Sequence, residues 1–150
     1  MNMNIEYEIR ENKYGKGIYV LEDVKKNTCI WTYKLNNNVF EYSAEQSITH
    51  LEQLPTLEEQ QRFLELTFGK GDKLCLITDD GKYVNHSEKP NCKTDLINGN
   101  CYSLRDIKKD EEILEDYNNF THPPFLFPLL EKYNSEPSYY TIADIHKIQN

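Results

Sequence analysis

The chain has 150 residues, of which 38% are hydrophobic and 12% aromatic, and it carries a formal net charge of −8. This length suits one domain, and the apolar content suffices for a packed core, which excludes a wholly disordered chain. The acidic charge disfavours nucleic acid and anionic membranes as partners and favours a basic partner. The same charge is also compatible with a plain role in solubility.

The N-terminal segment is polar and carries Glu6, Glu8 and Glu11, so it lacks the pattern of a signal peptide. No run reaches the roughly 20 apolar residues that cross a bilayer. We therefore expect an intracellular protein, in the nucleus or the cytoplasm, with no membrane partner. The four cysteines form no C-x-x-C pair, which predicts buried, reduced thiols and no metal site.

Short strands dominate the first part of the chain. Residues 5–10 alternate apolar and charged side chains, which is typical of a half-buried strand, and the Y-G-K-G sequence that follows predicts a turn. Three further apolar stretches predict strands at residues 18–21, 29–34 and 39–42.

The segment over residues 55–68 changes to helical spacing. Apolar residues recur there at steps of seven and four, namely Leu57, Leu64 and Phe68. Thr56 and Glu59 have the spacing of a capping box, which predicts where the helix begins. This is the one helix that the pattern indicates before residue 120.

The second part of the chain returns to short strands separated by polar turns, at residues 74–77, 82–84, 101–107 and 111–117. Beyond residue 120 the sequence becomes aromatic and partly helical in its spacing, and Thr141 with Asp144 is placed to cap a final helix. The whole pattern is mostly β with one inserted helix, which excludes an alternating βαβ array.

Three motifs contain the residues that could form a site. They are G-K-G at residues 15–17, N-H-S-E-K-P-N at residues 85–91, and R-D-I-K-K-D-E-E-I-L-E-D-Y at residues 105–117. Taken singly, each has a simple structural explanation: a turn between strands, an Asx-type turn with a satisfied histidine, and a charged hairpin with solvent-facing carboxylates. The G-K-G motif does not have the pattern of a phosphate-binding loop.

Taken together and in this order, the motifs resemble the SET domain, the family of S-adenosylmethionine-dependent protein-lysine methyltransferases. The resemblance covers roughly residues 5–120. It implies a β-clip of short strands with a pseudoknot, in which the N-H-S segment threads under the chain around D-Y. We accordingly expect a SET domain over residues 1–120 with a helical insert at 41–73, and an aromatic tail at 121–150 that packs on this core.

The resemblance also implies roles for individual residues. Asn85 and His86 would hold S-adenosylmethionine, together with the backbone around Lys16 and Gly17. Tyr117 would place its hydroxyl near the point of methyl transfer, as an orienting group and not as a general base, since a phenol has a pKa of about 10.

Tyr33 would lie near the active site as a further catalytic residue and would line the lysine channel, of which Phe120 would form a wall. Many relatives read N-H-S-C and carry a cysteine-rich tail, which together bind zinc and close the channel. Position 88 is instead glutamate, and no cysteine follows Cys101. The closing role would then fall to residues 121–145. Either Phe125 or Phe127 would pack over the adenine, with the last helix over the channel mouth, or these aromatics would simply dock the tail.

Three functions follow from these residues. The first is a protein-lysine N-methyltransferase acting on a basic protein such as a histone tail. The second is a SET-like module that has lost catalysis and only binds a peptide or partner. The third is a β-rich interaction protein with coincidental motifs. The joint presence of Asn85, His86 and Tyr117 favours the enzyme. The sequence lacks a basic stripe of the kind that is typical of nucleic-acid binding. A homodimer in which the partner completes the site stays an open alternative.

Overall fold

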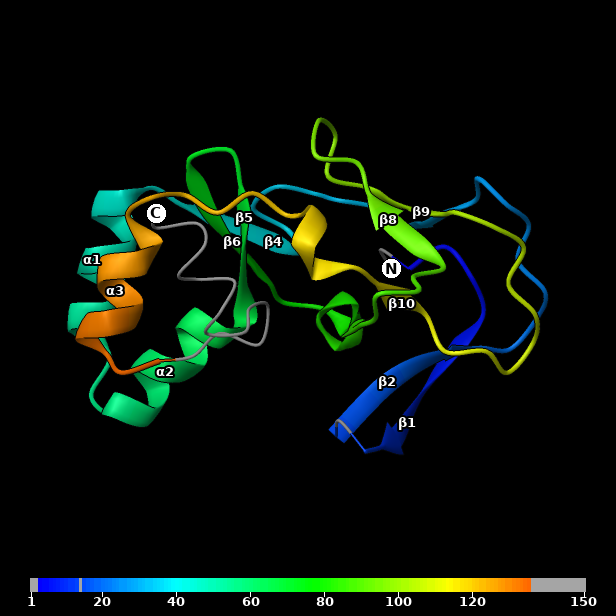
Figure 1. The fold of residues 1–150 in the computed structure, drawn as a ribbon, viewed down its shortest axis with the longest axis horizontal. Coiled ribbons are helices and arrows are strands. Elements are labelled where there is room, and N and C mark those ends of the chain that lie inside the picture. Colours follow the sequence, from blue (N-terminus) through cyan, green and yellow to red (C-terminus); the bar gives the residue numbers. More distant parts are fainter. Residues whose placement is uncertain (1–2, 14, 136–150) are drawn as a thin grey trace. The chain divides into compact units, whose positions relative to one another are not determined.

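The computed structural model describes residues 3–13 and 15–135. The chain divides into two compact units, each built from two separate stretches (Figure 1). The first unit combines the chain up to Asn38 with Thr78–Asn119. The second combines Val39–Ile77 with the chain from Phe120 onwards. Over the described residues, no helix has both the length and the apolar character needed to span a membrane.

The first unit holds a hairpin and a five-stranded sheet. In the hairpin, β1 (Tyr7–Asn12) pairs antiparallel with β2 (Gly15–Val20). The sheet has the strand order β3-β9-β8-β10-β7. Its strands are β3 (Cys29–Trp31), β7 (Asn85–His86), β8 (Cys92–Thr94), β9 (Cys101–Ser103) and β10 (Leu114–Glu115). These strands are so short that pairing with neighbours, and not side-chain alternation, defines them.

The threading of β10 confirms the predicted pseudoknot. This strand pairs in parallel with β7, with Leu114 opposite Asn85 and Glu115 opposite His86. On its other side Glu115 pairs in parallel with Cys92 of β8. Because β10 lies between β7 and β8, the N-H-S segment and the segment before D-Y are hydrogen-bonded neighbours although they are distant in sequence.

Fully buried branched side chains form the core of the first unit. They come from β2, from β3, and from the chain between β9 and β10, and include Ile18, Val20, Ile30, Ile107 and Ile113. Burial of each such side chain contributes about 1.5–3 kcal/mol. The core therefore fixes both β2 and the chain entering β10, which carry the candidate site.

The strand predicted at residues 82–84 is wrong. The structure has a 3₁₀ helix there, η1 (Asp80–Tyr83). The carboxylate of Asp79 caps this helix by accepting the N–H of Gly81 at 2.9 Å, and it also accepts the indole N–H of Trp31 at 3.0 Å. This local capping outweighs the strand propensity of the apolar pair that follows.

The second unit combines an antiparallel sheet with the three α-helices of the described residues (Figure 1). The sheet has the order β4-β6-β5, formed by β4 (Val39–Tyr42), β6 (Lys73–Ile77) and β5 (Thr67–Lys70). The helices are α1 (Ala44–Gln53), α2 (Leu57–Leu66) and α3 (Leu126–Lys132).

Side-chain caps begin α1 and α2, and the cap of α1 was not predicted from the sequence. In α2 the hydroxyl of Thr56 accepts the N–H of Glu59 at 3.1 Å, as predicted. The helix ends at Leu66, earlier than expected, because the next residues form β5. Ser43 and Gln46 form a complete capping box, with reciprocal bonds of 3.2 and 2.9 Å, and it begins the unexpected helix α1.

The helices bury one hydrophobic cluster with β6. Its members are Leu51, Phe63, Leu64, Leu74, Leu126, Phe127, Leu129, Leu130 and Tyr133. The chain that leads into α3 also needs Gly69 of β5, because a Cβ there would lie 1.6 Å from the carbonyl oxygen of Thr121. The described part of the tail thus packs against the insert. The final helix predicted around Thr141 lies outside the described residues.

Candidate active site

His86 and Tyr117 are joined directly where β7 and β10 end. The backbone N–H of Tyr117 donates to Nδ1 of His86 at 3.1 Å, and the two ring centroids are 5.2 Å apart. Because Nδ1 accepts this hydrogen bond, the ring proton in this arrangement lies on Nε2. The imidazole therefore fixes the backbone at the start of the D-Y turn.

The hydroxyl of Tyr117 donates to the carbonyl oxygen of Val84. Burial raises the pKa of Tyr117, and the nearby carboxyl of Glu115 raises it further. The phenol is therefore neutral at physiological pH. Its proton is engaged with the backbone, so toward any further group the hydroxyl oxygen can act only as an acceptor.

Asn85 connects this region to the glycine-containing strand. Its amide nitrogen donates to the carbonyl oxygen of Lys16 at 2.8 Å and to Oε2 of Glu112 at 2.8 Å. Gly17 makes the arrangement sterically feasible, since a Cβ there would lie 2.5 Å from the same Oε2. Gly17 thus allows the side chain of Glu112 to approach β2 closely.

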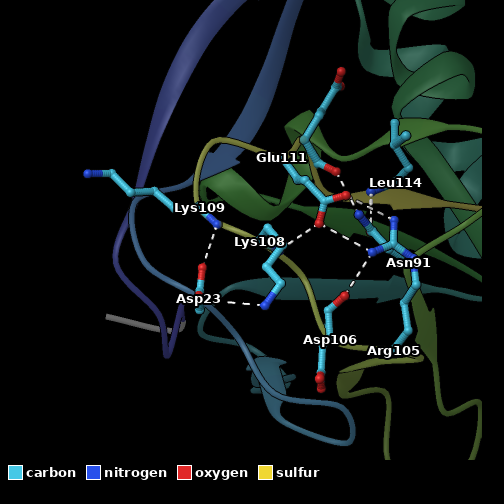
Figure 2. A network of polar contacts seen from close by, with 9 residues as sticks. Asp23, Asn91, Arg105, Asp106, Lys108, Lys109, Glu111 and Leu114 are labelled. Atoms are coloured by element: carbon cyan, nitrogen blue, oxygen red, sulfur yellow. Dashed lines mark hydrogen bonds and ion pairs between the residues drawn. The ribbon is translucent and has the colours of Figure 1, made fainter.

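The chain from Arg105 to Leu114 is held by polar contacts that Figure 2 shows. The carboxylate of Glu111 accepts from the guanidinium of Arg105 at 3.2 Å and from the backbone N–H of Lys108 at 2.6 Å. Asn91 accepts the N–H of Leu114 at 2.8 Å. These bonds position the segment that enters β10. Its charged side chains therefore hold the backbone in place and do not only face solvent.

Asp110 occupies the turn of this segment with a φ of 73°, the left-handed conformation that aspartate tolerates. Its carboxylate accepts from the guanidinium of Arg10 at 2.7 Å. This bond lowers the pKa of Asp110. Aspartate is therefore compatible with the left-handed conformation of this turn.

A buried polar cluster lies beneath the site. The carboxylate of Glu115 accepts the backbone N–H of Thr94 at 2.6 Å, and burial raises its pKa to about 7. Cys92 and Cys101 are also buried, and one ligand atom from each of these three residues lies within 4.8 Å of the others. Cys92 donates to the carbonyl oxygen of Leu114. Binding of a metal by the thiolate of Cys92 would require this hydrogen bond to break. The absence of a metal stays a prediction.

The structure brings together Lys16, Gly17, Asn85, His86 and Tyr117, all within the first unit. Tyr33 belongs to the same unit. Its backbone N–H donates to Asn100 at 2.9 Å, and its ring packs on Gly99, where an added Cβ would lie 2.4 Å away.

Phe120, predicted for the channel, and Phe125 and Phe127, predicted for the lid, lie in the second unit. The ring centroid of Phe120 is 4.8 Å from that of Phe68. Phe127 is 9% exposed within the hydrophobic cluster, and Phe125 packs against that cluster. These positions favour the docking role for both phenylalanines, and the roles of Tyr33, Phe120, Phe125 and Phe127 at the active site stay predictions.

Glu112 and Glu115 were missed by sequence reasoning, which placed the carboxylates of this stretch in solvent. One signal was available. If residues 111–117 form a strand, alternation places Glu111 and Glu115 on one face with Ile113 as well, so an acidic residue must share a face with a core residue. The actual geometry depends on the pairing of β10 with β7 and β8.

Comparison with known proteins agrees with this geometry. The model of the SET domain family matches residues 15–118. The chain is 28% identical over 117 residues to a protein of Arabidopsis thaliana named Histone-lysine N-methyltransferase ASHH2, which covers 73% of this chain and 6% of that protein. The chain thus spans only a small part of this relative's length.

Among solved structures, a candidate histone methyltransferase of Plasmodium falciparum has a TM-score of 0.52 with 21% identity, over 75% of this chain and 93% of that one. This likeness concerns the fold. Since the family model covers well over half of its residues, the chain belongs to the SET domain family.

Proposed function

We propose that the chain is an S-adenosylmethionine-dependent protein-lysine N-methyltransferase that acts on a basic protein, with histone tails as the expected substrate class. The observation that carries this proposal is the parallel pairing of β10 with β7, beside which Asn85, His86 and Tyr117 meet. Membership of the SET family and the similarity to a relative named as a histone-lysine N-methyltransferase support it. The net charge of −8 suits a basic partner.

The residues of the site fit the proposed cofactor. S-adenosylmethionine, when bound, supplies a methyl group on a positively charged sulfur. Asn85 offers an amide oxygen to an ammonium group, and the absence of a side chain at Gly17 keeps the backbone of β2 accessible to a ligand. The backbone around Lys16 and His86 provides further polar groups for the remainder of the molecule.

Tyr117 would orient the reacting groups. Its proton is donated to Val84, so the hydroxyl oxygen presents lone pairs to a cationic or polarised hydrogen-bearing group. Because the pKa of Tyr117 is raised, the phenol cannot take the proton of the lysine at neutral pH. Its contribution would be one of orientation, an effect that can supply about 7–11 kcal/mol in total for well-placed reactants.

The substrate lysine must lose its proton before transfer. An unperturbed lysine has a pKa of about 10.4, so the neutral amine costs about 4.6 kcal/mol at pH 7. A partly apolar channel lowers this pKa because it desolvates the ammonium. The chain would then need no general base at the amine.

The test is incubation with radiolabelled S-adenosylmethionine and mixed core histones. We expect label in a histone band with the wild-type chain and a loss of at least about tenfold in rate with Tyr117→Phe. Tyr102→Phe is the matched control. Tyr102 is a half-buried residue of β9 whose hydroxyl accepts from Asn98 and Asn100 at 3.1 and 3.2 Å.

An unchanged rate for Tyr117→Phe would contradict the role of its hydroxyl. A wild-type chain that binds S-adenosylmethionine by calorimetry but labels no protein in the histone mixture would contradict the enzymatic proposal for this substrate class. It would favour the binding module.

A further inference from the structure

The side-chain amide of Asn85 has only one orientation compatible with its surroundings. Its two nearest partners, the carbonyl oxygen of Lys16 and the carboxylate of Glu112, are both acceptors at 2.8 Å. The amide nitrogen must face them, and the amide oxygen must point away. Among the described residues, none donates a hydrogen bond to that oxygen. Asn85 therefore presents an acceptor, and not a donor, to a ligand.

Glu112 is itself held in place from two sides. Its Oε1 accepts from the hydroxyl of Tyr19 at 3.3 Å, and that hydroxyl accepts from Asn12 at 3.1 Å. The carboxylate also fills the space that a Cβ on Gly17 would take. The backbone is fixed too, because the carbonyl of Glu112 accepts from Asn91 at 2.8 Å. These contacts fix the half-buried carboxylate of Glu112, which in turn fixes the side-chain amide of Asn85.

We propose that Glu112 is a positioning residue that determines ligand specificity. By fixing the Asn85 amide, it makes the site select ligands that offer an ammonium donor, such as the amino-acid end of S-adenosylmethionine. This inference rests on the proposed function. Glu112 does not touch the ligand in this account and acts only through Asn85.

Two other roles for Glu112 are distinguishable from this one. If it acts through its negative charge, removal of the charge weakens binding of cationic ligands whatever replaces it. If it is only part of the scaffold, its removal weakens all ligands alike. Glu112→Gln keeps an oxygen that accepts from Asn85, and its amide can donate to the hydroxyl of Tyr19. Glu112→Leu has a similar size and no acceptor.

The experiment measures dissociation constants by calorimetry for three ligands. S-adenosylmethionine and S-adenosylhomocysteine both carry the ammonium group, although only the first has a charged sulfur. 5′-Methylthioadenosine lacks the amino-acid part. For Glu112→Leu we expect the dissociation constant to rise about tenfold or more for the first two ligands and to change less than about threefold for the third. For Glu112→Gln we expect all three to stay within about threefold of wild type.

The coupling to Asn85 gives an independent readout. In an Asn85→Ala background, Glu112→Leu should have no further effect on either ammonium-bearing ligand, since the two residues act as one unit. Glu112→Ala provides a second variant without an acceptor if the leucine variant does not fold. Retained binding of 5′-methylthioadenosine shows in each case that the site is folded.

Distinct results would overturn this inference. An equal loss for all three ligands would indicate a scaffold role, and equal losses for the leucine and glutamine variants would indicate a role of charge. A loss confined to S-adenosylmethionine would point to the sulfonium and not to the ammonium. If the wild-type chain binds none of the ligands, the proposed function fails and the inference fails with it.

Discussion

The backbone N–H of Tyr117 and Nδ1 of His86 form a 3.1 Å hydrogen bond between residues 31 positions apart. This bond ties the two segments of the pseudoknot together, and the hydroxyl of the same tyrosine donates to the carbonyl oxygen of Val84. The side chain of His86 consequently helps to position Tyr117, independently of any contact that the backbone of His86 makes with a ligand. The bond is local enough to be tested by substitution.

His86→Ala should destabilise the first unit by about 1–2 kcal/mol, because the N–H of Tyr117 loses its acceptor. His86→Asn should recover much of this, since the amide oxygen of asparagine can lie near the place of Nδ1. The measurement is urea unfolding followed by the fluorescence of Trp31, the single tryptophan, which lies in the same unit. Equal stability of both variants would show that the bond is unimportant.

Gly17→Ala should weaken the binding of S-adenosylmethionine by about tenfold or more, as its Cβ displaces the carboxylate of Glu112. Gly71→Ala is the control. Gly71 has a φ of +63° and open space around its Cα, so alanine there should cost about 1–2 kcal/mol of stability without a change in affinity. The measurements are calorimetric titration and thermal melting. Similar affinities for both variants would argue against close packing at Gly17 as a requirement for binding.

Glu115→Gln should become more stable than wild type as the pH rises. Burial raises the pKa of Glu115 from 4.5 to about 7. Below pH 4.5 the carboxyl is protonated in both the folded and the unfolded state, so its ionisation costs nothing. Between pH 4.5 and 7 the unfolded state ionises first, and the wild-type stability falls. Above pH 7 the full cost is about 3 kcal/mol, which the glutamine variant avoids.

The control for this prediction is Glu111→Gln, whose stability relative to wild type should fall as the pH rises. The hydrogen bond from Arg105 lowers the pKa of Glu111, and the N–H of Lys108 lowers it further. The wild-type carboxylate therefore stabilises the fold above pH 4.5, and this advantage disappears as the pH falls through the lowered pKa. Urea unfolding at pH 4, 6 and 8 measures both variants. A difference for Glu115→Gln that does not grow with pH would contradict the prediction.

Phe127→Ala should cost about 3–5 kcal/mol of stability, because the side chain is buried in the cluster of the second unit. Phe125 is only half-buried, so Phe125→Ala should cost less. The lid hypothesis adds that Phe125→Ala weakens the binding of S-adenosylmethionine at a temperature where the protein is folded. Unchanged affinity in that variant would leave Phe125 with the docking role alone.

Much of the fold could be predicted because its signals are local or because the motifs occur together. The capping box at Thr56 predicted the start of α2, alternation predicted the strand near β1, and apolar stretches predicted β2, β4 and β6. The meeting of Asn85 and Tyr117 has no local signal at all. It was predicted from the joint order of the motifs, and the pairing of β10 with β7 confirmed it.

Other features were beyond this reasoning for physical reasons. Strands of two residues such as β7 and β10 have no periodicity to detect, and their hydrogen bonds come from partners far away in sequence. At residues 82–84, the propensity of Tyr83 and Val84 suggested a strand, whereas the cap from Asp79 formed a 3₁₀ helix. The role of Glu112 depends on Tyr19 and Asn85, two residues from separate motifs.

The insert leaves and rejoins the first unit at one place. The N–H of Thr78 donates to the carbonyl oxygen of Asn38 at 2.9 Å, so the inserted segment of residues 39–77 begins and ends at neighbouring backbone positions. Segments of different length or sequence could be grafted at this junction without a change in the path of the flanking chain. During evolution, the part of the chain that carries Asn85 and Tyr117 could thus stay constant while residues 39–77 diversified. Each new version would need an apolar surface against which α3 packs.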